Sequence, residues 1–165
     1  MADIKFKGHP AHTSGELPKV GAKAPSFILV KSDLSDASLE SYAGKNKILN
    51  IFPSIDTGVC ATSVRKFNTE AASAPNTVVL NISMDLPFAQ KRFCGAEGIT
   101  NVEMLSAFRS SFGKDYGLMM VDTPLAGLCS RVVIVISADD KVVYTEQVAD
   151  ITIEPNYAAA LKAVR

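Results

Sequence analysis

Three short runs of almost uninterrupted apolar residues constrain the fold of this 165-residue chain more than any other feature. They cover residues 48–52, 77–83 and 131–137, and each has the length of a strand. Strands that are apolar on both faces occur in sheets that are covered on both faces. Segments with helical periodicity stand between the runs. The chain therefore predicts an α/β fold in which helices flank a central mixed sheet.

Other segments complete this expectation. A hairpin is expected around Gly8, from residues 4–6 and 11–13, and another across Asp139 and Asp140, between 131–137 and 141–147. The further expected elements are a strand at 26–30, a helical turn at 38–42, a helix at 59–73, a helix from Asp85 or Leu86 that ends at Gly95, a strand at 101–105, a helix at 107–116 and a helix from Glu154 or Pro155 to Ala163.

Composition narrows the class of protein. The length fits one domain, residues 1–165, and the formal net charge is zero, which gives no reason to expect nucleic acid or a charged membrane as a partner. No apolar run approaches the roughly 20 residues that cross a bilayer, and the first residues lack an apolar signal core. We therefore expect a cytoplasmic protein. Three widely spaced cysteines favour reduced thiols with chemical roles over a structural disulfide framework.

Cys60 holds the most informative position of the three. It follows the first apolar run and falls in the first turn of the helix expected at 59–73. Unpaired backbone N–H groups and the positive end of the helix dipole meet a side chain there, and both favour the reactive thiolate. The alternative is an inert buried thiol, because Cys60 shares an apolar helix face with Val64, Phe67 and Ala71.

The residues around Cys60 carry a family resemblance. Pro53, Thr57 and Cys60 fit the Pro-x-x-x-Thr-x-x-Cys motif of the peroxiredoxins. Longer strings resemble the thiol peroxidase branch, the atypical two-cysteine peroxiredoxins: Asn50-Ile-Phe-Pro-Ser-Ile-Asp-Thr-Gly-Val-Cys60, Ser63-Val-Arg-Lys-Phe-Asn68, Asp85-Leu-Pro-Phe-Ala-Gln90 and Arg92-Phe-Cys-Gly-Ala-Glu97. The resemblance runs from about Ile4 to Ala163 and implies a thioredoxin-like fold of the peroxiredoxin type with an N-terminal β-hairpin.

The resemblance assigns roles that the residues alone leave open. It places the hydroxyl of Thr57 in the thiolate–peroxide site, whereas the spacing to Cys60 equally suits a helix N-cap. Pro53 either shields the site from water or simply ends the strand. Arg131 is implied as the active-site arginine, with a snorkelling arginine at the sheet rim as the alternative. Arg65 is a poorer candidate, because it lies beyond the first helical turn and off the face of Cys60.

The other two cysteines differ in what they imply. The resemblance assigns Cys94 as the resolving thiol of the same chain, which would close a disulfide with Cys60 after local unwinding of its helix end. Without the resemblance, Cys94 is interpreted as an ordinary helix-end residue. Cys129 departs from the family pattern. It would share a strand face with Arg131 and could compete with Cys94, although a bystander thiol is favoured.

The resemblance implies a thioredoxin-dependent peroxidase. Cys60 would reduce hydrogen peroxide and alkyl hydroperoxides without metal, flavin or haem, thioredoxin would recycle the Cys60–Cys94 disulfide, and the chain would form a homodimer. Two rivals on the same fold are a thiol–disulfide oxidoreductase, which lacks its second thiol at Ser63, and a redox sensor. His9 and His12 form a pair that is weak as a metal signal and fits a solvent-facing hairpin better.

Overall fold

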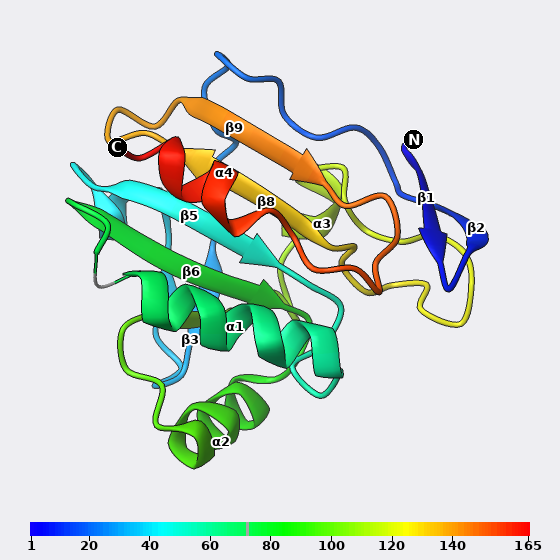
Figure 1. Ribbon diagram of the computed structural model, residues 1–165, viewed down its shortest axis with the longest axis horizontal. Coiled ribbons are helices and arrows are strands. Elements are labelled where there is room, and N and C mark those ends of the chain that lie inside the picture. Colours follow the sequence, from blue (N-terminus) through cyan, green and yellow to red (C-terminus); the bar gives the residue numbers. More distant parts are fainter. Residues whose placement is uncertain (72) are drawn as a thin grey trace.

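The computed structural model describes residues 1–71 and 73–165. Within this part of the chain a seven-stranded sheet and a separate two-stranded hairpin form (Figure 1). The elements in chain order are β1 (Asp3–Phe6), β2 (His9–His12), β3 (Leu29–Lys31), β4 (Asp36–Ala37), the 3₁₀ turn η1 (Leu39–Tyr42), β5 (Asn46–Ile51), α1 (Gly58–Ala71), β6 (Thr77–Ser83), α2 (Pro87–Glu97), β7 (Glu103–Ser106), α3 (Phe112–Asp115), β8 (Val132–Ile136), β9 (Val142–Gln147) and α4 (Tyr157–Lys162).

The sheet is mixed and covered on both faces, as predicted. Its strand order is β4-β3-β7-β6-β5-β8-β9, with β5, β6 and β7 parallel and the other pairs antiparallel. Neighbouring residues of β5 point to opposite cores. Ile48 packs with Phe67 of α1 and Leu161 of α4, whereas Leu49 packs in the cluster that contains Phe112 of α3. Figure 1 shows the same layering, with α1 and α4 in front of the sheet and α3 behind it.

The predicted end of the second helix was wrong. We expected Gly95 to end it, but α2 continues to Glu97, and Gly98 is the C-cap. Gly98 has φ 64°, the left-handed conformation that glycine adopts without steric cost, and its N–H donates to the carbonyl of Cys94. Gly95 has no such backbone and lies within the helix. Cys94 therefore belongs to the last full turn of α2.

Other predicted element boundaries also differ from those in the structure. The helix expected at 107–116 shrinks to α3, because the N–H of Ala107 still pairs with the end of β6 and the serines that follow form a turn. The last helix begins late, at Tyr157, where the side chain of Asn156 accepts the N–H of Ala159 as N-cap. The strand expected at 26–30 is only β3, and α1 begins one residue early, at Gly58. The predicted place of Ala71 on the apolar face lies outside the described side chains.

Strand register brings the ends of two distant segments together. In the antiparallel pair of β5 and β8, Ile51 stands opposite Val132. The chain leaving β5 toward α1 therefore lies beside the residue that enters β8, which is Arg131. On the other side of β5, Ile82 of the parallel strand β6 also stands opposite Ile51, and β6 ends one residue later, at Ser83. This edge of the sheet is where the segments around residues 53–57, 83–87 and 131 meet.

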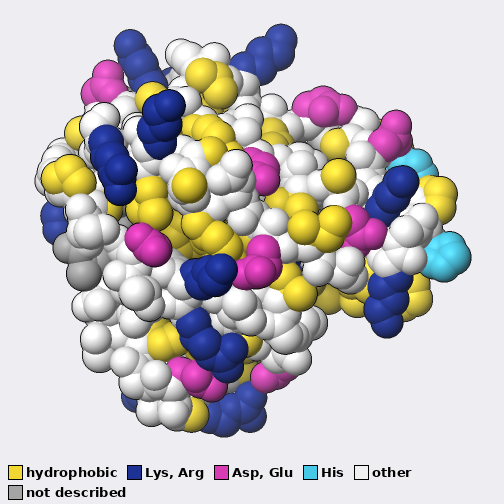
Figure 2. Space-filling view, in the orientation of Figure 1, with side chains coloured by type: hydrophobic (Ala, Val, Ile, Leu, Met, Phe, Trp, Pro, Cys, Tyr) yellow, Lys and Arg dark blue, Asp and Glu magenta, His cyan; other side chains and the backbone are white. Residues whose placement is uncertain are grey.

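The surface carries charges of both signs. On the face shown in Figure 2, Lys and Arg side chains are interspersed with Asp and Glu, and the histidines lie at the end that holds the β1–β2 hairpin. Among the described residues, we find no helix with both the length and the hydropathy that a bilayer crossing requires.

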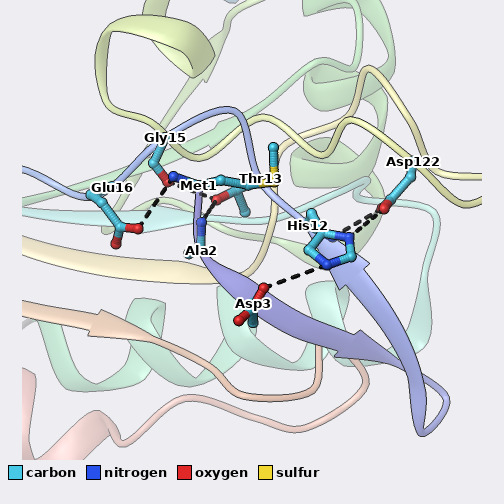
Figure 3. A network of polar contacts seen from close by, with 8 residues as sticks. All are labelled: Met1, Ala2, Asp3, His12, Thr13, Gly15, Glu16 and Asp122. Carbon is cyan, nitrogen blue, oxygen red and sulfur yellow. Dashed lines mark hydrogen bonds and ion pairs between the residues drawn. The ribbon is translucent and has the colours of Figure 1, made fainter.

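His12 fastens the hairpin to the rest of the molecule (Figure 3). Its N–H donates to Asp122 Oδ1 at 2.9 Å, and its ring Nδ1 lies 2.6 Å from Asp122 Oδ2. The second ring nitrogen lies 3.4 Å from Asp3 Oδ1. The hydrogen bond to Asp122 raises the pKa of His12, and the same bond lowers the pKa of Asp122. Both ring nitrogens of His12 thus face carboxylates, which agrees with the weak metal signal of the His9–His12 pair.

The substitution Asp122→Asn is expected to move the pKa of His12 back toward its ordinary value of 6.5, because the amide carries no charge to pair with an imidazolium. The raised pKa means that this pair contributes stability below about pH 6.5 and loses it as the pH rises through the folded pKa. An NMR titration of the His12 ring measures the shift. Asp3→Asn is the matched control and should act more weakly, because Asp3 is farther from the ring. A His12 titration that is the same in Asp122→Asn and wild type would contradict the assignment.

Candidate active site

Cys60 lies at the start of α1, where the loop leaving β5 turns into a helix. It is the third residue of the helix, and its side chain is fully buried. The first main-chain bond of α1 runs from the N–H of Ala61 to the carbonyl of Thr57, so Thr57 occupies the N-cap position. The sulfur therefore lies in the first turn, near unpaired N–H groups and the positive end of the helix dipole, as the sequence predicts.

Arg131, the residue immediately before β8, reaches the sulfur. Its side chain is 2% exposed, and its Nη2 lies 3.2 Å from Cys60 Sγ. Its Nε donates to the carbonyl of Ile151 at 2.7 Å, which fixes the plane of the guanidinium. The third nitrogen, Nη1, is buried and has no hydrogen-bond partner among the described residues. Arg131 is therefore no snorkelling arginine at the sheet rim, because the whole guanidinium is inside the protein.

A small cavity of about 330 Å³ opens beside Arg131 and the residues that precede Cys60. Most of its lining is apolar, and the lining residues come from four separate stretches of the chain: Phe6, Lys7, Pro53, Thr57, Gly58, Val59, Leu125, Arg131, Ile151 and Thr152. The hairpin held by His12 supplies Phe6 and Lys7. The cavity therefore has the size for a small substrate, and its one fully buried charged group is the arginine that touches Cys60.

Thr57 and Pro53 line the cavity beside Cys60. The Thr57 hydroxyl donates to the carbonyl of Ser54 at 3.0 Å. Among the hydrogen bonds of the described residues, this hydroxyl accepts none from the Cys60 N–H, so the side-chain cap considered from the spacing is not what the structure shows. Pro53 is buried and follows the last residues of the strand. Both residues therefore border the same cavity as Arg131.

Cys94 shares an apolar cluster with Cys60. The cluster is formed by Phe52, Ile55, Cys60, Val64, Ile99 and Met104, and Cys94 packs against it as a partly buried residue beside Phe93. Burial raises the pKa of the Cys94 thiol. The other side of Cys94 borders an open cavity of about 760 Å³ at the end of α2. None of the three cysteines forms a disulfide in this structure.

Cys129 packs in a different core. Its side chain is 1% exposed and belongs to the cluster on the α3 face of the sheet, with Leu118 and Val132. Burial, with the charge of Asp85 as a smaller cause, raises the pKa of the Cys129 thiol to about 12. Strand β8 begins only at Val132, so the shared strand face expected for residues 129 and 131 does not form. The geometry favours the bystander interpretation of Cys129.

Sequence reasoning missed a pair of buried amides and one carboxylate that support the Cys60 turn. Asn50 and Asn81 stand opposite each other in β5 and β6, both fully buried, and Asn50 Nδ2 donates to Asn81 Oδ1 at 2.8 Å and to Ser63 Oγ at 3.2 Å. The Ser63 hydroxyl in turn donates to the carbonyl of Cys60 at 2.8 Å. An amide inside an otherwise apolar run was the available signal. The missed carboxylate is Asp85, which accepts hydrogen bonds from Ser54 and Ile55 in the loop before Cys60.

Comparisons with known proteins agree with this geometry. The sequence matches the redoxin family, described as Redoxin, over residues 19–161. It is 56% identical over 164 residues to a thiol peroxidase of Mycobacterium tuberculosis, and the match covers 99% of both chains. The chain belongs to the thiol peroxidase family. This confirms the predicted resemblance and the prediction of a thiol peroxidase enzyme.

Solved structures confirm the predicted fold. A peroxiredoxin-like protein from Aquifex aeolicus superposes with a TM-score of 0.94 at 36% identity, covering 99% of this chain and 96% of the other. A thiol peroxidase from Chromobacterium violaceum has a TM-score of 0.90 at 27% identity, covering 97% and 93%. The AhpC protein of Enterococcus faecalis, at 19% identity and a TM-score of 0.75 over 88% and 89% of the chains, shares the fold alone.

Alkylation should separate Cys129 from the other thiols. In the folded protein at about pH 8, iodoacetamide is expected to modify Cys94, which borders an open cavity, and to leave Cys129 unmodified, because the raised pKa of about 12 keeps the Cys129 thiol protonated. Peptide mass spectrometry after a timed exposure measures both sites, and the same reaction in urea is the control in which Cys129 reacts. Modification of Cys129 as fast as Cys94 in the folded protein would contradict its placement in the core.

Proposed function

We propose that this thiol peroxidase reduces hydrogen peroxide and alkyl hydroperoxides at Cys60, that Cys94 resolves the oxidised sulfur, and that thioredoxin regenerates both thiols. The observation that carries the proposal is the contact of 3.2 Å between Arg131 Nη2 and Cys60 Sγ inside a buried site. A guanidinium cannot lose its charge at ordinary pH, so a thiolate is the form of Cys60 that it attracts. Thiolates, not thiols, attack peroxides.

The first step is an in-line attack. The Cys60 thiolate displaces the leaving oxygen of the O–O bond and takes the other oxygen to become a sulfenic acid. The leaving oxygen departs as water or alcohol after it gains a proton. The Nη1 group of Arg131, which has no hydrogen-bond partner among the described residues, is available to donate to a peroxide oxygen. Preorganised donors of this kind stabilise charge as it develops in the transition state.

The cavity lining suits this chemistry. The Thr57 hydroxyl borders the space where the peroxide would lie, and Pro53 closes one side of it. A largely apolar wall excludes water, which strengthens the electrostatic effect of the arginine. Phe6, Val59 and Leu125 give an alkyl group apolar surface to contact. These features support hydroperoxides with an organic tail as substrates alongside hydrogen peroxide.

Cys94 completes the cycle. Its thiol condenses with the Cys60 sulfenic acid, which forms the disulfide and releases water. The two thiols already contact one apolar cluster, which supports Cys94 as the partner. Cys60 is fully buried in α1, and the Cys94 carbonyl holds the C-terminal cap of α2, so bond formation requires the ends of these helices to unwind locally.

Reduction follows by thiol–disulfide exchange. A thiolate of thioredoxin attacks the disulfide, and its second thiol then releases a reduced enzyme and an oxidised thioredoxin. The rival oxidoreductase needs a second thiol at position 63, where the Ser63 hydroxyl instead binds the carbonyl of Cys60. We propose cytoplasmic location and a homodimer from the family resemblance, with residues 1–165 acting as one domain.

One experiment tests the cycle. Reduced protein receives one equivalent of hydrogen peroxide, and peptide mass mapping then identifies the disulfide, which should join Cys60 and Cys94. Cys60→Ser is expected to abolish peroxide consumption. Cys94→Ser should still consume one equivalent but lose turnover with thioredoxin, because nothing resolves the sulfenic acid.

Cys129→Ser is the matched control and should behave as wild type. Peroxide consumption that survives Cys60→Ser would refute the assignment of the nucleophile. A Cys60–Cys129 link, or a link between chains, would replace Cys94 as the resolving thiol.

A further inference from the structure

The carboxylate of Asp85 ties the segment before Cys60 to the sheet. Its Oδ1 accepts the hydroxyl of Ser54 at 2.7 Å, and its Oδ2 accepts the N–H of Ile55 at 2.7 Å and the hydroxyl of Ser83 at 2.6 Å. Among the ion pairs of the described residues, none includes Asp85. Three charge-assisted hydrogen bonds therefore balance this carboxylate, and two of them come from one short loop.

The segment that contains Asp85 is itself held in place by hydrogen bonds. Ser83 is the last residue of β6 and is fully buried, and its hydroxyl also receives Gln90 Nε2 at 3.1 Å. Gln90 belongs to α2 and donates again to the carbonyl of Leu105 at 3.0 Å. The Ser106 hydroxyl of β7 donates to the main-chain carbonyl of Asp85. Asp85 is therefore anchored to two strands and a helix before it contacts the loop.

Ser54 links Asp85 to Thr57 through hydrogen bonds. The carbonyl of Ser54 accepts both the N–H of Thr57, at 3.2 Å, and the hydroxyl of Thr57, at 3.0 Å. The Ser54 hydroxyl also accepts the N–H of Asp56 at 3.2 Å. Asp56, Thr57 and Gly58 are exposed, so few packing contacts hold this turn. The orientation of Thr57 over the cavity depends on Ser54, and Ser54 depends on Asp85.

We propose that Asp85 is a positioning residue for peroxide reduction: through Ser54 it holds the Thr57 turn in the geometry that aligns a hydroperoxide with Cys60. This rests on the proposed function. It gives a role to the Asp85-Leu-Pro string, which the sequence offered only as part of a resemblance. The residue acts by geometry and not by charge, since a carboxylate near the site would disfavour a thiolate rather than support it.

Two variants test the link from opposite ends. Asp85→Asn keeps the size of the side chain but leaves one acceptor fewer, whereas Ser54→Ala removes the linking hydroxyl and leaves the carboxylate charge in place. Both should lower the second-order rate of Cys60 oxidation by hydrogen peroxide, measured by competition with a haem peroxidase, by about 10- to 100-fold. Iodoacetamide alkylation of Cys60, which needs no aligned peroxide, should change by less than about threefold.

The double variant and two further variants sharpen the result. Ser54→Ala combined with Asp85→Asn should cost no more than the larger single effect, because both changes break one link. Ser54→Thr, which keeps the hydroxyl, should restore most of the rate. Asp56→Asn is the matched control: it removes a neighbouring carboxylate whose nearest cation, Arg92, lies 3.4 Å away on the surface, and it should leave the rate unchanged.

The outcomes distinguish the two proposals. Wild-type protein that consumes no peroxide would refute the proposed function, whatever the variants do. Active wild type with an unchanged rate in Asp85→Asn would refute the positioning role alone. Equal losses in oxidation and alkylation, or additive effects in the double variant, would also overturn it, because they indicate a general disturbance of the fold around Cys60.

Discussion

The buried guanidinium of Arg131 is the interaction on which this site depends. A charge in the protein interior is costly unless it is paired and hydrogen-bonded. The carbonyl of Ile151 satisfies one nitrogen, and among the ion pairs of the described residues no carboxylate reaches the others. The Cys60 sulfur, 3.2 Å from Nη2, is the side-chain group in contact with this charge, and in the proposed mechanism it is the sulfur that attacks the peroxide. One contact therefore places the positive charge of Arg131 directly beside the sulfur of Cys60.

The fold places Arg131 and Cys60 side by side. Arg131 precedes five fully buried residues of β8, so its backbone is fixed by the centre of the sheet. A loop connects β5 to Cys60, and this loop begins beside the end of β8 that Arg131 enters. The segment containing Ile151 and the hairpin with Phe6 then cover the pair, and Ile4 packs with Ile151 in a separate small core. Strands β5 and β8 thus fix the positions of Cys60 and Arg131, while loops and the hairpin form the walls of the cavity.

Sequence patterns predicted the parts of the fold that depend on local physics. Apolar runs gave the central strands because burial on both faces leaves no polar alternation. Helix ends were predicted less well, since Gly95 and Gly98 are equally good candidates until the backbone conformation is known. Residues 107–116 have helical periodicity, but the N–H of Ala107 pairs with the sheet, and that pairing is set by the neighbouring strand rather than by its own sequence.

The residues of the site also differ in how well the sequence predicts them. The place of Cys60 at a helix start made it a candidate nucleophile, and the family motif around it favoured that interpretation over an inert buried thiol. Arg131 could be placed only through the family resemblance, because its approach depends on β8 lying beside β5 in one particular register. The contacts of Asp85 with Ser54 and Ile55 span about thirty positions of sequence and follow from no pattern of spacing. Long-range polar contacts of this kind set the geometry of a site, and they become visible only in the folded chain.

The most direct test of the account is the single-turnover rate of Cys60 oxidation by hydrogen peroxide in the Arg131→Lys variant. Lysine keeps a positive charge but cannot bind the Ile151 carbonyl and contact the sulfur with a planar fork at the same time. The account predicts a loss of about 100-fold in the rate constant. A folded Arg131→Lys protein that reacts at the wild-type rate would contradict it.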